Sequence, residues 1–140
     1  MSRLSRCAPW ILLLACACSG CSRHKPVYPV LGKIVDAQGN ALAGATVIFC
    51  PVEDVGDNVN KPAGLANEQG NFTLTTYKQN DGAPAGDYVV TVMWRTGPKD
   101  PKKPRQAPPD RLQGKFTDPS KSPLKATIVK GENSVEIKLP

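Results

Sequence analysis

The chain has 140 residues with 18 Lys and Arg against 12 Asp and Glu, which gives a formal net charge of +6. This length suits a single domain that can bury its own apolar core. The one histidine, His24, excludes a histidine-based zinc site, which needs three or four ligands, and no Gly-x-Ser-x-Gly, phosphate-loop or HExxH motif occurs.

Residues 1–20 have the layout of a secretory signal. Arg3 and Arg6 form a short basic start, an apolar run follows at 10–14, and small residues lead to Cys21. The apolar run is much shorter than the roughly 20 residues that a spanning helix needs. We therefore predict a lipoprotein signal peptide at 1–20 and a mature protein outside the cytoplasm.

The end of this signal, 19–21, resembles a bacterial lipobox, whose cysteine is diacylated on sulfur and becomes the new N-terminus. Cys18 stands where that motif usually has Leu, Val or Ile, and Cys18 and Cys16 remain alternative acylation sites. An ordinary secretory signal with incidental cysteines is the other interpretation. The resemblance implies palmitate on Cys21 and a membrane anchor, and Ser22 after the cysteine implies the outer membrane.

Residues 21–29 are predicted to be a tether, because Pro26 and Pro29 oppose regular structure. Beyond it, short runs of β-branched and aromatic residues alternate with turn residues. In chain order the predicted strands are 30–35, 45–50, 64–66, 71–76, 88–94, 125–129 and 135–139, the last two as a pair around Gly131. The period of two predicts an all-β domain over 30–140, an antiparallel sandwich or barrel.

Within these strands, alternate residues should share the buried face. Ala45, Val47 and Phe49 form one such set, and the run from Tyr88 to Trp94 forms another. Cys50 is the one cysteine after Cys21, so we expect no internal disulfide. A small packed hydrophobe is the expected role of Cys50, with a redox thiol or a dimer link as the alternative.

The segment 97–123 is rich in proline and basic residues and poor in apolar ones. One interpretation is a binding arm, with Lys99, Lys102, Lys103, Arg105 and Arg111 as its cations. The other is a solvated, mobile connection between strands. In either case we expect Leu112 and Phe116 to pack back on the sandwich.

A family resemblance emerges from several motifs in order. The stretches 32–36 and 42–49, the turn and Gly-x-Phe of 67–74, and 84–92 resemble carboxypeptidase regulatory-like, or transthyretin-like, domains. The part 115–133 resembles small bacterial lipoproteins built on that domain. The resemblance implies a seven-stranded antiparallel prealbumin-like (Ig-like) β-sandwich.

No catalytic residue can be named within this pattern. Hydrolysis of 5-hydroxyisourate, which this fold can host, needs several histidines and a different C-terminus. The acidic residues Glu53, Asp54 and Asp57 could bind calcium, but a solvated loop is the preferred interpretation. We therefore expect no cofactor and no metal.

The expected function is that of a lipid-anchored envelope module. It would contact an envelope protein or an anionic glycan without catalysis, and we expect no nucleic-acid partner. The alternative is an accessory domain of an extracytoplasmic hydrolase-type enzyme, or such an enzyme itself.

Overall fold

The computed structural model describes residues 24–53 and 59–140. Within them the chain forms nine strands and no helix, which confirms the all-β class. The strands are β1 (Val27–Tyr28), β2 (Val30–Val35), β3 (Thr46–Pro51), β4 (Ala63–Leu65), β5 (Asn71–Thr73), β6 (Ala83–Pro84), β7 (Gly86–Met93), β8 (Lys125–Ile128) and β9 (Asn133–Lys138). That part of the chain has no helix long and apolar enough to cross a bilayer.

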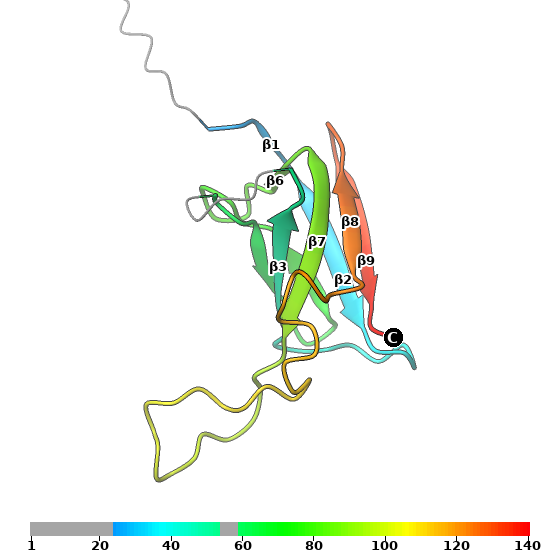
Figure 1. Ribbon diagram of the computed structural model, residues 1–140. Coiled ribbons are helices and arrows are strands. Elements are labelled where there is room, and N and C mark those ends of the chain that lie inside the picture. The colour runs from blue at the N-terminus through cyan, green and yellow to red at the C-terminus, as the bar shows by residue number, and fades with distance from the viewer. Residues whose placement is uncertain (1–23, 54–58) are drawn as a thin grey trace, which may run out of the picture.

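The strands form three sheets (Figure 1). One sheet has the order β5-β2-β9, another has β4-β3-β7-β8, and β1 pairs with β6 in a short ribbon. Each of the seven predicted ranges overlaps a strand, but the described residues add β1 and β6, and β2 pairs with β9 in parallel. Where the sequence predicted seven antiparallel strands, the described residues thus form nine strands in three sheets with one parallel pair.

The sequence predicted that the last two strands pair with each other, but they do not. Strand β8 pairs with β7, whereas β9 joins β2 in the other sheet. Asn133 separates them: its side chain accepts a hydrogen bond from the Val129 N–H at 2.9 Å and donates one to the Val129 carbonyl at 2.9 Å. The Asn133 N–H donates to the Pro29 carbonyl at 3.0 Å. This hydrogen bond places the start of β9 beside the start of β2.

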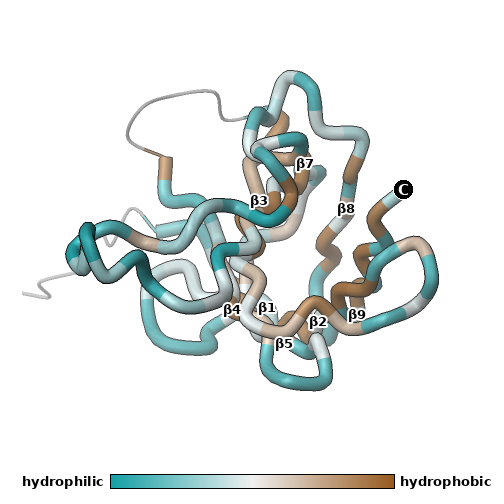
Figure 2. The backbone as a smooth tube through the Cα atoms, turned by 90° about the horizontal axis from the view of Figure 1, so that it is seen from below, coloured by the Kyte–Doolittle hydropathy of each residue, from teal (hydrophilic) through white to brown (hydrophobic). Residues whose placement is uncertain are grey.

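The core lies between the two larger sheets. Val47 and Phe49 of β3 and Val90 of β7 are fully buried, and they face Ile34 of β2 and Ile137 of β9. This confirms the predicted alternation, since the intervening residues of β3 and β7 point to the other face. Seen along the sandwich in Figure 2, the apolar strand segments gather in the middle and the connecting loops are mostly hydrophilic.

The Phe72 ring packs directly on the backbone of β2. Gly32 is its partner residue in the β2–β5 register, and a methyl group on Gly32 would overlap the ring. The ring also lies 6.4 Å from that of Phe49, centroid to centroid. The glycine thus allows a large aromatic side chain to fill the space between the sheets.

Two turns of the sandwich share one construction. The side chains of Asp36 and Asn67 each accept backbone N–H groups from residues two and four positions further on. Each turn contains a glycine with positive φ, 90° at Gly39 and 78° at Gly70, a conformation that glycine adopts without steric cost. The Asp36 turn follows β2, and the Asn67 turn joins β4 to β5.

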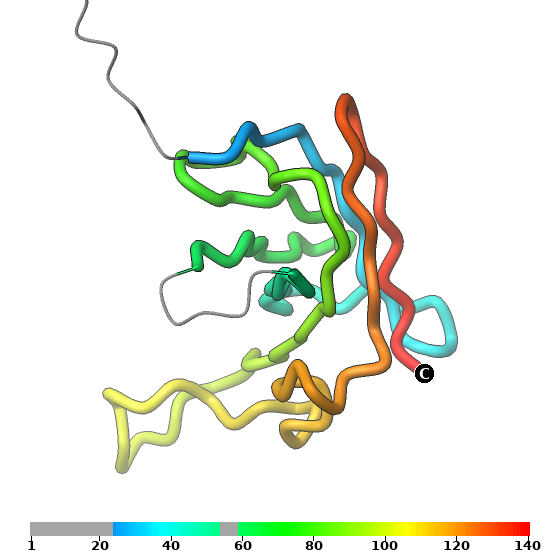
Figure 3. The backbone as a smooth tube through the Cα atoms, turned by 45° about the horizontal axis from the view of Figure 1, so that its top comes forward, coloured from blue at the N-terminus to red at the C-terminus, as the bar shows by residue number. Residues whose placement is uncertain are grey.

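Strand β7 connects the two ends of the domain. The β1–β6 ribbon next to residue 24 lies where β7 begins at Gly86, and the long loop leaves where β7 ends at Met93 (Figure 3). Eight residues of strand span about 26 Å at ~3.3 Å per residue. The start of the described chain and the long basic loop are therefore at opposite ends.

Candidate functional site

The basic residues predicted as a binding arm divide into two groups. Lys99, Lys102, Lys103 and Arg105 lie on an exposed excursion of the chain, which we call the arm (residues 97–109). None of the four forms an ion pair with a carboxylate that the structure describes. Figure 2 shows the arm extending from the sandwich as a mostly hydrophilic segment.

Two consecutive turns shape the arm. The Lys103 N–H donates to the Asp100 carbonyl at 2.9 Å, and the Gln106 N–H donates to the Lys103 carbonyl at 3.0 Å. The Asp100 carboxylate accepts the Lys102 N–H at 2.9 Å. Prolines at 98, 101 and 104 restrict φ between these points. The cations are thus carried on a backbone with restricted conformations.

Asp110 fixes the end of the arm to the sandwich. Its carboxylate accepts three backbone N–H groups, from Trp94 at 2.8 Å, Leu112 at 3.1 Å and Gly114 at 2.9 Å. Partial burial raises the pKa of Asp110, but these hydrogen bonds and the charge of Arg95 outweigh it, so the pKa lies below the ordinary value. The ionised carboxylate therefore holds both ends of the arm together.

Arg111 is exposed as well, but it belongs to this attachment and not to the arm. Its guanidinium Cζ lies 3.9 Å from the centroid of the Trp94 ring, and the backbone N–H of Arg111 donates to the Trp94 carbonyl at 2.9 Å. The indole Nε1 in turn donates to the Ala43 carbonyl at 2.8 Å. The structure thus separates Arg111 from the other four predicted cations.

The remainder of the loop packs on the sandwich, as predicted for Leu112 and Phe116. Phe116 is buried in the core and Leu112 is half-buried against it. The Phe116 carbonyl accepts the Val92 N–H at 2.9 Å, and the buried Ser122 hydroxyl donates to the Val90 carbonyl. The predicted single loop 97–123 is therefore an exposed arm followed by a packed segment.

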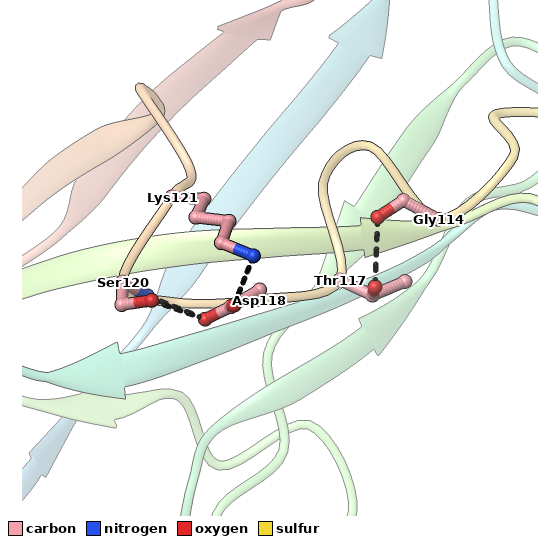
Figure 4. A network of polar contacts seen from close by, with 5 residues as sticks. All are labelled: Gly114, Thr117, Asp118, Ser120 and Lys121. Atoms are coloured by element: carbon pink, nitrogen blue, oxygen red, sulfur yellow. Dashed lines mark hydrogen bonds and ion pairs between the residues drawn. The ribbon is translucent and has the colours of Figure 1, made fainter.

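A polar turn stabilises this packed segment (Figure 4). Asp118 accepts hydrogen bonds from the Ser120 hydroxyl at 2.6 Å and the Ser120 N–H at 2.9 Å, and it pairs with Lys121 Nζ at 3.6 Å. The Ser120 hydrogen bonds, with the charge of Lys121, lower the pKa of Asp118. The Thr117 hydroxyl donates to the Gly114 carbonyl at 2.9 Å. Lys121 is thus paired, unlike the four cations of the arm.

Several predicted sites lie elsewhere or outside the described residues. Cys21, Cys18, Cys16, Asp54 and Asp57 fall in the segments that the structure does not describe. Across 24–53 and 59–140, no three His, Cys, Asp or Glu side chains are grouped so that they could hold a metal ion.

The two other residues singled out from the sequence lie in the described part. The His24 ring contacts that of Tyr77 at a tilt of 45°, with centroids 4.4 Å apart, and Cys50 is a buried free thiol.

Two hollows lie away from the arm. One of about 360 Å³ at the β1–β6 end is lined by His24, Tyr77 and Asp87 among others. A broader groove of about 690 Å³ crosses the outer face of β5-β2-β9, with the exposed Leu31 and Leu65 in its walls.

Four carboxylates have a pKa below the ordinary value, and all four accept backbone N–H groups at turns: Asp36, Asp81, Asp110 and Asp118. Their role is structural.

Sequence reasoning missed Asp110 and Trp94 as the attachment of the arm. The sequence holds a signal for Asp110. Its side chain accepts the backbone N–H of Gly114, four positions later, just as Asp36 and Asn67 accept the N–H groups four positions after them.

No protein-family model, curated protein or solved structure matches the chain.

Proposed function

We propose that this protein is a lipid-anchored β-sandwich module of the cell envelope, with a non-catalytic binding role. The observation that carries the proposal is the short distance along the chain between Cys21 and the first strand at Val27. That stretch can reach at most about 22 Å, at ~3.3–3.6 Å per residue. Acyl chains on Cys21, each worth ~0.8 kcal/mol per buried CH₂, would hold the domain close to a bilayer, the outer membrane in our proposal.

The finer fold that we propose is the prealbumin-like sandwich of the carboxypeptidase regulatory-like domains. If the two-residue strands β1 and β6 are counted as a lateral ribbon, seven strands remain, three in one sheet and four in the other. A disulfide is not needed to hold them, because Val47, Phe49 and Val90 belong to one continuous core. This arrangement supports the resemblance seen in the motifs of the sequence.

The binding role is supported by the arm. Four exposed cations, unpaired within the described chain, lie on a loop whose ends are fixed by Asp110 and Arg111. A fixed attachment with an exposed charged tip is typical of a recognition loop on a rigid scaffold. We propose an envelope protein or an anionic glycan as the partner.

The anchor is tested by labelling the full chain with a palmitate analogue in a bacterial host. The natural sequence should incorporate label and enter the detergent phase on phase separation, and Cys21→Ala should lose both. Cys18→Ala and Cys16→Ala are the matched controls and should retain both. Label that persists in Cys21→Ala and disappears in one of the controls would move the anchor to that cysteine, and no label in the natural sequence would refute the proposal.

A further inference from the structure

We propose that the arm binds an acidic polysaccharide on the side of the domain that faces away from the anchoring bilayer. The direction rests on the proposed anchor at Cys21, whereas the binding itself does not. The charge of the arm is the first argument. The arm carries four cations and a single carboxylate: Lys99, Lys102, Lys103 and Arg105 against Asp100. The Asp100 carboxylate already accepts the backbone N–H of Lys102.

The composition of the arm favours a polysaccharide over a protein. Protein interfaces depend on aromatic and aliphatic anchors that fill pockets on the partner. Residues 97–109 contain no aromatic residue, and Ala107 is their one non-proline apolar side chain. Such a segment binds through charge and hydrogen bonds, which suits a chain of repeated carboxylates.

The shape of the arm favours a polymer over a small anion. Its cations are distributed along a proline-restricted segment with two turns, not gathered in a cavity. The hollow at the β1–β6 end and the groove over β5-β2-β9 have no arm residue in their walls. Charges spread over an exposed, turned segment can contact several charges of a linear polyanion.

The position of the arm argues against the headgroups of the anchoring bilayer as its partner. A lipid on Cys21 brings the β1–β6 end nearest the bilayer, and β7 separates that end from the arm by about 26 Å. At physiological ionic strength the Debye length is ~8 Å, so the headgroup potential falls to roughly one twenty-fifth over that distance. The cations of the arm therefore attract polyanions on the side of the domain that faces away from the bilayer.

The binding is tested with fluorescent polygalacturonate as the acidic polymer and dextran as the neutral one. The full chain and its Cys21→Ala form should both bind polygalacturonate, in a salt-sensitive manner, and neither should bind dextran. The variant Lys99→Gln/Lys102→Gln/Lys103→Gln/Arg105→Gln should raise the dissociation constant by about tenfold or more. The control Lys33→Gln/Lys125→Gln/Lys130→Gln/Lys138→Gln removes the same charge from exposed positions on β2, β8, β9 and the β8–β9 turn. It should change the dissociation constant by less than about twofold.

The direction is tested with the lipidated chain inserted in neutral phosphatidylcholine vesicles. Part of the polymer binding depends on the cations of the arm. Addition of anionic phosphatidylglycerol to the same bilayer should change that part by less than about twofold. Loss of that binding would show that the arm lies on the bilayer and would overturn the direction. Absence of polymer binding in Cys21→Ala, or equal binding by the arm variant, would overturn the site. Failure of the chain to insert, with polymer binding intact, would refute the anchor alone.

Discussion

The guanidinium of Arg111 lies over the indole ring of Trp94, with its Cζ 3.9 Å from the ring centroid. The two residues are the first fixed points on either side of the arm, and their backbones are also joined by a hydrogen bond of 2.9 Å. The contact therefore sets where the arm leaves the sandwich and where it returns.

Arg111→Gln should lower the free energy of unfolding by about 0.5–1 kcal/mol, because an exposed cation over a half-buried aromatic ring contributes about that much. Trp94 is the one tryptophan after residue 20, so its fluorescence reports the change directly. Chemical denaturation followed by that fluorescence measures both. Arg105→Gln removes an exposed cation of the arm and is the control, with a change within about 0.5 kcal/mol. Equal stability of the two variants would contradict a structural role for Arg111.

Asp110→Ala should be more damaging, because three backbone N–H groups lose their acceptor. We expect a loss of about 3 kcal/mol in the free energy of unfolding, with faster proteolysis within the arm. Asp100→Ala removes a single N–H acceptor on the exposed arm and should leave thermal unfolding nearly unchanged. A similar small effect of both substitutions would show that the arm is held by other contacts.

Acid should destabilise the fold through its turn carboxylates. Partial burial raises the pKa of Asp110 and Asp81, but backbone hydrogen bonds outweigh it and leave both values below the ordinary 3.8. This contribution to stability is complete above the unfolded-state pKa, and it is lost as the pH falls through the lower folded-state pKa. Denaturant titrations from pH 6 to pH 2 should show the free energy of unfolding falling below about pH 4. In Asp110→Asn the fall should be shallower, and an unchanged slope would contradict the assignment.

Gly32→Ala should destabilise the sandwich by about 1–3 kcal/mol, since the new methyl group overlaps the ring of Phe72. Phe72→Leu in the same chain should recover part of that loss, because the smaller side chain makes room. A double-variant cycle by thermal denaturation measures the coupling. Additive losses would show that the glycine is needed for another reason.

Replacement of residues 99–107 by a short Gly-Ser linker should leave the free energy of unfolding within about 0.5 kcal/mol of the natural value, since loop closure depends only weakly on length. Phe116→Ala, in the packed segment of the same loop, should cost about 3–5 kcal/mol. Differential scanning calorimetry compares the two. A large loss from the linker variant would place the arm within the cooperative unit.

The sequence predicts the long strands well because burial on one face leaves a period of two. Val47 and Phe49, or Tyr88 and Val90, are recognisable without any partner, since the pattern is local. Strands β1 and β6 have two residues each and lie among prolines, so they have no periodicity to detect. The parallel pairing of β2 with β9 joins opposite ends of the sequence, and no local pattern encodes it.

The candidate site shows the same limit. Exposed basic residues can be read from composition, so Lys99 to Arg105 were predicted together. The position of Arg111 depends on Trp94 and Asp110, which meet only when the end of β7 and the loop come together in space. Composition treats the five cations alike, whereas the fold assigns one of them to a structural contact.

The course of β7 from one end of the domain to the other also has a mechanical consequence. Traction between residue 24 and the arm would pass from β1 through its two-residue ladder with β6 into β7, which leads directly to the arm. β7 would carry the tension along its covalent backbone, while its ladders with β3 and β8 keep it in its sheet. The short ribbon would therefore part before the two larger sheets are disturbed.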